Sequence, residues 1–236
     1  MRFWRKAHKW LGFLVAIQIL LWISGGVIMS IFPIEKVRGQ HLIKPLYELP
    51  KPINRALAHN INLANWQAIS WQRRGTEWMI KATDFDNNFT WLHPDNGQII
   101  SPLIDSQIKQ LASLQHANVA HITSVEALQA LPFEVRHLSL PMYQVNFDDW
   151  INSTFYIDPQ SGKIASVRSD IWRLYDFFWM LHIMDYEQRD NFNNPLLIIA
   201  AICSLAFTFT GLILVYFSII KPWYARVKYR IRIRHS

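Results

Sequence analysis

Two histidines stand next to the chain's longest apolar segments, where an imidazole could ligate a haem iron. His8 precedes the first segment between Lys6 and Lys9, and His182 lies in an aromatic stretch ahead of the second. A neutral imidazole on a rigid helix, facing an apolar pocket, is a common axial ligand to haem. The alternative interpretation of His8 is one more polar residue at a membrane surface. The alternative for His182 is a side-chain pair with Asp185, three residues further along a helix.

The remaining residues that could do chemistry form no recognisable site. The five-residue spacing of His116 and His121 is poor for a shared metal ion. The single cysteine, Cys203, excludes an intramolecular disulfide and a cysteine-based metal site. No nucleophile motif, glycine-rich phosphate loop or dinucleotide-binding fingerprint is present, so an independent hydrolytic enzyme is not expected. Six histidines are interpreted as ordinary surface or core residues: His41, His59, His93, His116, His121 and His137.

Two uncharged segments predict membrane-spanning helices. Residues 10–32 carry no charge and are interrupted only by Gln18, Ser24 and Ser30, and residues 195–220 carry no charge either. As helices, both can cross the ~30 Å hydrocarbon layer of a bilayer. We therefore expect transmembrane helices over residues 10–33 and 195–220, with the lipid bilayer as a partner. A cleaved signal peptide is the alternative for the first, although the segment is long for one and no Ala-x-Ala site closes it.

The positive charge of the chain is concentrated at its two ends. The basic N-terminus (residues 1–9) carries +4 and the basic tail (residues 221–236) carries +6, whereas the whole chain has a net charge of +7. Everything between is therefore slightly acidic, which argues against a nucleic-acid partner. Basic residues beside both apolar segments place both termini in the cytoplasm of a two-pass protein. We expect the protein in a bacterial inner (plasma) membrane, with residues 34–169 on the extracytoplasmic side.

The central region contains an internal repeat. Residues 78–100 read WMIKATDFDNNFTWLHPDNGQII and residues 143–165 read YQVNFDDWINSTFYIDPQSGKIA, and they align without a gap at a spacing of 65. Pro94-x-x-Gly97 then matches Pro159-x-x-Gly162, where proline presets φ and glycine tolerates a positive φ. Apolar residues alternate along the flanking segments. We predict a strand, a turn, a second strand, a Pro-x-x-Gly turn and a third short strand in each copy.

The predicted fold class is membrane α+β, in which two transmembrane helices flank an extracytoplasmic pair of small α/antiparallel-β units. The units would extend over about residues 52–105 and 117–169 and pack as a pair, because one alone buries too little surface. A helix is expected ahead of each strand set, over residues 52–64 and 124–131. The second begins Ser-Val-Glu-Ala, which resembles an N-cap followed by an acid. Residues 170–194 are expected to form a helix, over residues 170–186, and a linker at the outer membrane surface.

The repeat and the two ends of the chain resemble a known family. The second copy, which ends Asp-Pro-x-Ser-Gly-Lys-Ile, resembles the PepSY domain better than the first, in which His93 replaces the acidic residue. The ends are similar to the PepSY-associated transmembrane family. Their matching residues are Arg5-Lys6-x-His8-x-Trp10-x-Gly12 with a later Ser24-Gly25 in the first apolar segment, and Thr210-Gly211-Leu212 in the second. The resemblance covers most of the chain and implies a short, two-helix member with two PepSY-like repeats.

The resemblance implies electron transfer, because larger four-helix members include haem-binding inner-membrane reductases of ferric siderophores. It implies b-type haem bound by His8 and His182, and an extracytoplasmic acceptor such as a ferric chelate. With two spans only, these histidines would lie about 25–30 Å apart at opposite faces and could not share one haem. A homodimer or larger membrane complex is therefore expected. The alternative function is a non-enzymatic, membrane-anchored PepSY module that binds or modulates a partner protein, such as a peptidase or a complex subunit.

Overall fold

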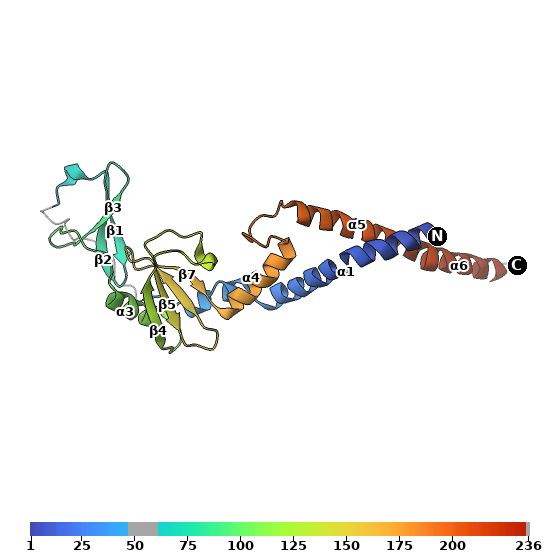
Figure 1. Cartoon of the computed structure of the whole chain (residues 1–236), viewed down its shortest axis with the longest axis horizontal. Coiled ribbons are helices and arrows are strands. Elements are labelled where there is room, and N and C mark those ends of the chain that lie inside the picture. Colours follow the sequence, from blue (N-terminus) through green and yellow to red (C-terminus); the bar gives the residue numbers. More distant parts are fainter. Residues whose placement is uncertain (47–60, 235–236) are drawn as a thin grey trace. The chain divides into compact units, whose positions relative to one another are not determined.

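Two long apolar helices flank a central α+β region with two small antiparallel sheets (Figure 1). The computed structural model describes residues 1–46 and 61–234. The chain divides into two compact units. We call Met1–Phe32 with Leu174–Ser236 the apolar unit, and Pro33–Arg173 the central unit.

The apolar unit is built on helices α1 (Arg2–Ile31) and α5 (Pro195–Val215). A π-helical turn, Tyr216–Ile220, continues α5 into α6 (Lys221–Arg234). Asn194 caps α5 by accepting a hydrogen bond from the Leu197 N–H at 2.9 Å, and Pro195 takes the first helical position, which needs no donor. Both predicted apolar segments are therefore helical and long enough to cross a membrane.

The outward faces of α1 and α5 expose large apolar side chains. Such faces are expected on helices that lipid surrounds, because lipid tails replace the protein core as the apolar environment. The arrangement is consistent with a two-pass membrane protein. The exposed side chains include Phe13, Leu14, Ile17, Leu20 and Ile23 on α1, and Ile198, Ile199, Ile202, Leu205, Phe209 and Leu212 on α5.

The internal repeat is confirmed as two matching hairpins. The first copy holds β2 (Glu77–Thr83) and β3 (Phe89–Leu92), and the second holds β5 (Tyr143–Phe147) and β6 (Thr154–Ile157). Both Pro-x-x-Gly turns have one hydrogen-bond pattern: Gly97 N–H donates to the His93 carbonyl at 2.9 Å, and Gly162 N–H to the Asp158 carbonyl at 2.7 Å. The glycine φ angles are 68° and 69°, which is why glycine stands at both positions.

The two copies differ in strand pairing. Ile80 pairs with Leu92, but Val145 pairs with Phe155 rather than with Ile157, which is the residue aligned with Leu92. The shift is two residues, so each side chain keeps its face of the sheet. The third short strand predicted after the Pro-x-x-Gly turn is wrong for the first copy, where Ile99 forms only an isolated bridge with Leu92. In the second copy it is confirmed as β7 (Ile164–Arg168).

The strand orders are β1-β2-β3 and β4-β5-β6-β7, with all pairings antiparallel. The first sheet begins with β1 (Ala68–Arg74) and the second with β4 (Ile122–Ala127). The 3-10 turn Phe133–Val135 lies in the long connection from β4 to β5. Short helical turns also lie ahead of the first sheet: α2 (Ile34–Val37), Gln40–Leu42 and Leu63–Asn65.

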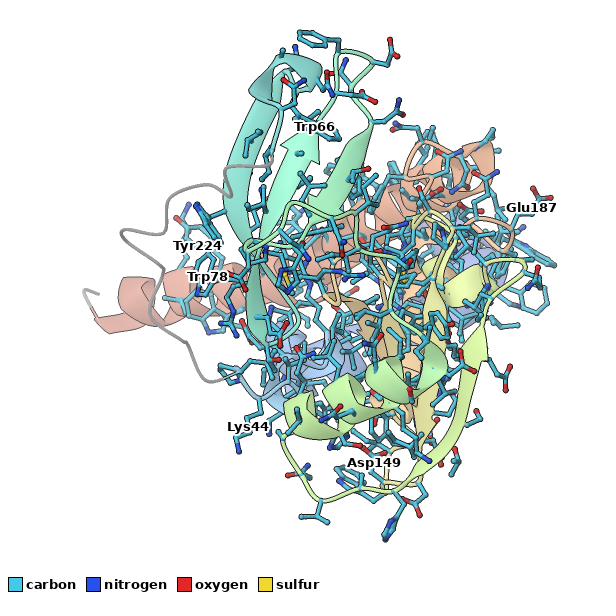
Figure 2. All side chains as sticks on the ribbon, turned by 90° about the vertical axis from the view of Figure 1, so that its left-hand side faces the viewer. Lys44, Trp66, Trp78, Asp149, Glu187 and Tyr224 are labelled. Carbon is cyan, nitrogen blue, oxygen red and sulfur yellow. The ribbon has the colours of Figure 1, made fainter. Side chains whose placement is uncertain are left out.

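The larger core lies between the second sheet and α3 (Asp105–Gln115). Ile108 and Leu111 of α3 pack with Val145, Phe155 and Ile157 of the sheet. The first sheet has a smaller core around Ile80, Ala82 and Leu92, against which Trp66 packs (Figure 2). Most of the central unit's apolar burial therefore comes from the second repeat and from the helix that precedes it in the chain.

One predicted helix is wrong and one helix was not predicted. Residues 124–131 do not form a helix, because Val125 pairs with Val145 as part of β4. The run Ile122-Thr123-Ser124-Val125 is rich in β-branched residues, which favour a strand over the N-cap that the sequence resembles. The longest helix that the structure describes within the central unit is α3, which lies between the two repeats. The other predicted helix, residues 52–64, lies mostly outside the described residues.

The helix predicted over residues 170–186 is confirmed as α4 (Asp170–Ile183), which ends three residues early. α4 begins in the central unit, and its residues from Leu174 onward belong to the apolar unit. It ends at His182 and Ile183, directly before Met184, whose φ of 54° is not helical. The end of this helix therefore decides where His182 is held.

Candidate functional site

His8 is fixed against α5 by one ring nitrogen. Its Nδ1 lies 2.9 Å from Thr210 Oγ1 and 3.2 Å from the Phe207 carbonyl oxygen, and its ring stacks on Phe207 at 4.2 Å between centroids. The Thr210 hydroxyl also donates to the Phe207 carbonyl at 2.7 Å. Since that carbonyl can only accept, the contacts favour a proton on Nδ1 and an unprotonated Nε2. No described residue forms a hydrogen bond with Nε2.

Two glycines make room for this stack. A Cβ at Gly12 would lie 2.8 Å from Phe207 Cε2, and a Cβ at Gly211 would lie 3.1 Å from His8 Cε1. Both distances are shorter than van der Waals contact, so alanine at Gly12 would displace the Phe207 ring and alanine at Gly211 would displace the His8 ring. The small-residue faces of α1 and α5 therefore serve the packing of an imidazole and a phenyl ring.

His182 sits at the end of α4 between two indole rings. The Trp22 and Trp179 centroids lie 6.2 Å and 6.5 Å from the imidazole, and the Trp179 ring is inclined to it by 11°. Its Nδ1 is buried and has no hydrogen-bond partner among the described residues. A Cβ at Gly25 would lie 3.8 Å from that nitrogen, so α1 approaches the ring closely. An unpaired buried nitrogen costs free energy, which makes His182 unusual for a residue that only fills space.

The side-chain pair with Asp185, which was the alternative interpretation of His182, is not formed. The Asp185 carboxylate instead accepts four backbone N–H groups in the loop that follows α4, at 3.0–3.2 Å. The hydrogen bond from the Asn191 N–H and the three others lower the pKa of Asp185 to about 2. The nearby loop donors therefore take up the carboxylate, which leaves the imidazole without it. The four donors belong to Glu187, Gln188, Asp190 and Asn191.

Side chains satisfy the last three carbonyl groups of α4. Gln18 Nε2 donates to the Leu181 carbonyl at 3.1 Å, and Trp22 Nε1 donates to the His182 carbonyl at 2.8 Å. Asn194 Nδ2 donates to the Ile183 carbonyl at 2.9 Å. A helix end leaves such carbonyls without intrahelical partners, and an apolar environment supplies no replacement. This explains why glutamine interrupts the first apolar segment.

We expect the substitution Trp22→Phe to loosen the end of α4. Phenylalanine keeps the aromatic contact with His182 but removes the donor to its carbonyl, which should cost about 1 kcal/mol of unfolding free energy. Thermal unfolding of the full chain in detergent micelles would measure the loss. Trp10→Phe is the matched control, because Trp10 is 63% exposed. Equal effects of the two substitutions would contradict a role for the Trp22 hydrogen bond.

The structure does not bring His8 and His182 together. His182 lies beside Gly25 of α1, which is 17 residues from His8. At a rise of 1.5 Å per residue this separates the two imidazoles by about 25 Å along the helix. Each histidine is therefore a separate candidate ligand with its own aromatic neighbours.

The neighbours of the two histidines were not predicted. Phe207 and Trp22 meet them through contacts between residues about 160 to 200 positions apart in the chain, which no local pattern indicates. Only Gln18 could have indicated one of these long-range contacts from the sequence, since a polar residue in an apolar segment usually has a specific partner.

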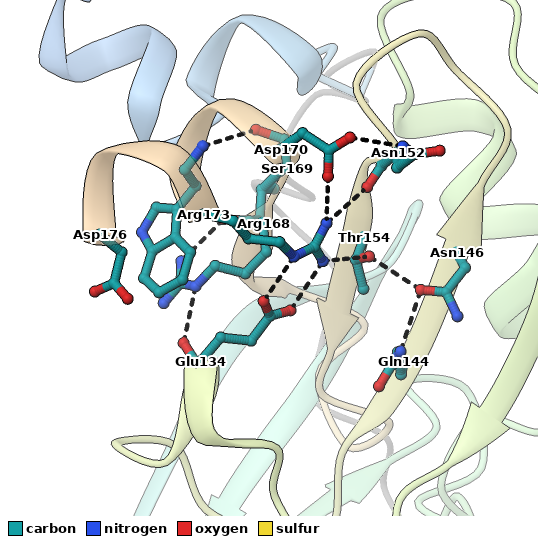
Figure 3. A network of polar contacts seen from close by, with 12 residues as sticks. Glu134, Gln144, Asn146, Asn152, Thr154, Arg168, Ser169, Asp170, Arg173 and Asp176 are labelled. Carbon is teal, nitrogen blue, oxygen red and sulfur yellow. Dashed lines mark hydrogen bonds and ion pairs between the residues drawn. The ribbon is translucent and has the colours of Figure 1, made fainter. Parts of the chain in front are cut away.

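The polar clusters of the central unit are ion pairs and hydrogen bonds that connect segments of the fold. Glu134 accepts from Arg173 through both carboxylate oxygens, at 3.0 and 3.2 Å, and Arg173 also contacts Asp170 at 3.1 Å (Figure 3). Elsewhere, His116 Nε2 lies 3.4 Å from Asp149 and 3.2 Å from Ser153 Oγ. Because both contacts share one ring nitrogen, they do not form a Ser-His-Asp relay. In the described part of the chain, no three His, Cys, Asp or Glu side chains are grouped to hold a metal ion.

Comparisons of the chain with protein-family models, with curated proteins and with solved structures found no match. The resemblance to the PepSY-associated transmembrane family therefore stays a prediction from the sequence. What the chain can do is argued from the positions of its own residues.

Proposed function

We propose that the chain is a two-pass subunit of a bacterial inner membrane, with both termini in the cytoplasm and the central unit on the extracytoplasmic side. Two apolar helices of sufficient length support insertion, and the basic residues at both ends of the chain support this orientation. The exposed apolar faces of α1 and α5 would contact lipid. PepSY-like repeats would then form the extracytoplasmic part.

We propose further that the subunit transfers electrons through b-type haem ligated by His8 and His182. The observation that carries the proposal is the tautomer of His8. Its Nδ1 is held by Thr210 and the Phe207 carbonyl, while Nε2 has no described partner. Histidines that ligate metals usually donate their other ring N–H to a protein acceptor, which fixes the ring and leaves the second nitrogen as the ligand. Bound haem would supply a one-electron carrier.

His182 supports the same function on weaker geometry. Its imidazole is held between Trp22 and Trp179, and its Nδ1 is buried without a described acceptor. A polar atom left unpaired in an apolar environment marks a functional position more often than a packing one. The ring would serve as the ligand nearer the extracytoplasmic side, where an acceptor such as a ferric chelate would be reduced.

Because the two histidines are too far apart to share one haem, each haem would need a second ligand from elsewhere, most simply from a second copy of the chain. Two haems would each receive one ligand from this chain and the equivalent ligand from its partner, in a dimer with twofold symmetry. The residues of this chain orient the imidazoles, and the apolar faces around them exclude water. Such a dimer would restore four long helices.

Haem binding is tested by spectroscopy on the purified full chain from haem-replete cells. We expect a reducible Soret band that His8→Ala weakens by at least half, because one of the two haems loses its ligands. His182→Ala should remove the other part of the band. His121→Ala is the control, since His121 is exposed in the central unit. A colourless wild type with normal helix content would contradict the proposal.

A second candidate function is a membrane-anchored module that binds a partner protein. The observation in its favour is β4, the outer strand of the four-stranded sheet, which pairs only with β5 among the described strands. An outer strand offers backbone N–H and C=O groups to a strand of a partner. Co-purification of a stoichiometric partner, such as a peptidase or a complex subunit, without any haem spectrum would favour this function over electron transfer.

A further inference from the structure

The central unit contains a groove between the β1–β2 hairpin and α3. Its volume is about 420 Å³, within the range of small-molecule sites. One side of the lining is apolar, contributed mainly by Leu103, Leu111 and Leu114, and the hairpin contributes Arg74. The groove thus combines an apolar wall with one cationic group.

Arg74 is buried and only partly hydrogen-bonded. Arg74 is 7% exposed, and its guanidinium carbon lies over the Trp91 ring, 6.0 Å from the ring centroid. Nε donates to the Gln160 carbonyl at 2.8 Å, and Nη2 donates to the Ser101 carbonyl. A guanidinium has five N–H donors, so three remain without a partner among the described residues. Both acceptors are neutral carbonyls, and no described carboxylate forms an ion pair with Arg74.

The electrostatics of this position favour an anion. Burial lowers the pKa of Arg74, and the more distant carboxylates of Asp158 and Glu77 act in the opposite direction. A cation kept away from water without a contacting counter-charge is costly. A carboxylate matches the fork of guanidinium donors and binds it through two parallel hydrogen bonds.

We propose that this groove binds a small organic acid, with the carboxylate on Arg74 and an apolar tail against Leu103, Leu111 and Leu114. The proposal is independent of haem binding, because every residue that carries it belongs to the central unit. The two hydrogen bonds to Gln160 and Ser101 also connect the hairpin to the neighbouring segments, and they orient the guanidinium for the ligand. The apolar wall selects against inorganic anions, which have no surface to bury there.

The probe is octanoate, with octanamide as the neutral control of equal length. Both are titrated by calorimetry into the full chain in nanodiscs of zwitterionic lipid, with empty nanodiscs as the reference. We expect saturable octanoate binding with a Kd below about 1 mM. Octanamide should bind at least tenfold more weakly, because it cannot form the charge-assisted pair. Equal affinity for both probes, or no saturable octanoate binding, would overturn the proposal.

Exposed polar residues at the rim give a second test that does not depend on Arg74. Glu77 and Gln110 line the groove and are exposed. We expect Glu77→Gln to strengthen octanoate binding and Gln110→Glu to weaken it, each by about threefold. Lys109→Gln is the control, because Lys109 is exposed on α3 outside the groove lining. Changes of the same sign in both rim variants, or an equal effect in the control, would refute recognition of an anion.

The direct variant is Arg74→Gln, which keeps some hydrogen-bonding capacity and removes the charge. We expect at least a tenfold loss of octanoate affinity, with octanamide binding unchanged. Near-ultraviolet circular dichroism would establish that the hairpin remains folded, since Trp91 lies beside Arg74. A folded variant that binds octanoate like the wild type would contradict the assignment of Arg74.

Discussion

Replacing Gly162 with alanine is expected to lower the free energy of unfolding of the central unit by about 2–4 kcal/mol. Gly162 has a φ of 69°, which costs an L-residue about 1–2 kcal/mol. An added Cβ would also lie 2.9 Å from Leu111 Cδ2 and 3.1 Å from the backbone nitrogen of Gly75. Leu111 lines the groove beside the hairpin, so the end of its side chain can shift, but the backbone of the neighbouring hairpin cannot yield cheaply.

The internal repeat supplies the control for this experiment. Gly97 occupies the same turn position with a φ of 68°, so Gly97→Ala carries the same backbone strain of about 1–2 kcal/mol. Thermal unfolding of both variants in the full chain, followed by near-ultraviolet circular dichroism, compares them under one condition. Hydrogen exchange of the Gly162 N–H, which donates to the Asp158 carbonyl, reports the turn itself. A Gly162 variant no less stable than the Gly97 variant would contradict the close packing of this turn.

Glu134→Ala is expected to destabilise the central unit by about 2 kcal/mol. The carboxylate accepts from Arg173 through both oxygens (Figure 3). It also accepts from the Tyr156 hydroxyl at 2.8 Å. Burial raises the pKa of Tyr156, and the hydrogen bond to Glu134 raises it further, so the hydroxyl remains a donor at neutral pH. Tyr156 is only 1% exposed. Removing the Glu134 carboxylate leaves the buried Tyr156 hydroxyl without an acceptor, whereas water can hydrate the half-exposed Arg173 guanidinium.

A double-mutant cycle isolates this interaction. Tyr156→Phe removes the donor, so its effect and that of Glu134→Ala should be less than additive by about 1 kcal/mol. Glu126→Ala on β4 is the charge-matched control, because Glu126 is exposed. Chemical denaturation of the full chain measures all of these variants. Additive effects of the two substitutions would show that the hydroxyl does not depend on Glu134.

The parts of the fold that local chemistry determines were predictable. The Pro-x-x-Gly turns, the hairpins beside them and the two apolar helices each follow from residues close together in the chain. The error at residues 124–131 arose because Ser124 and Glu126 imitate a helix start, whereas cross-strand pairing with β5 decides the outcome. The helix α3 was missed although Ile108, Leu111 and Ala112 have helical spacing, because it lies outside the repeat.

The candidate site was predictable only as two separate histidines. The stacking of His8 on Phe207 depends on how α1 and α5 align, and the sequence contains no local sign of that alignment. The environment of His182 depends on two tryptophans from different helices. The alternative pair of His182 with Asp185 is wrong because four backbone donors compete for the same carboxylate.

The contact between His8 and Thr210 also fixes a stagger between the two long helices. The two helices are antiparallel, so six residues before His8 corresponds to six residues after Thr210. Arg2, where α1 starts, is therefore level with Tyr216, where the π-helical turn begins. From that point the chain continues as one helix without α1 beside it, for 18 residues or about 27 Å. In the proposed orientation this arm leads away from the bilayer, with Lys221 at its membrane end and the last basic residue of the tail about 20 Å further out. Because the attraction of an anionic leaflet falls off within a Debye length, the arm would present most of the tail's positive charge to the cytoplasm rather than to the lipid headgroups.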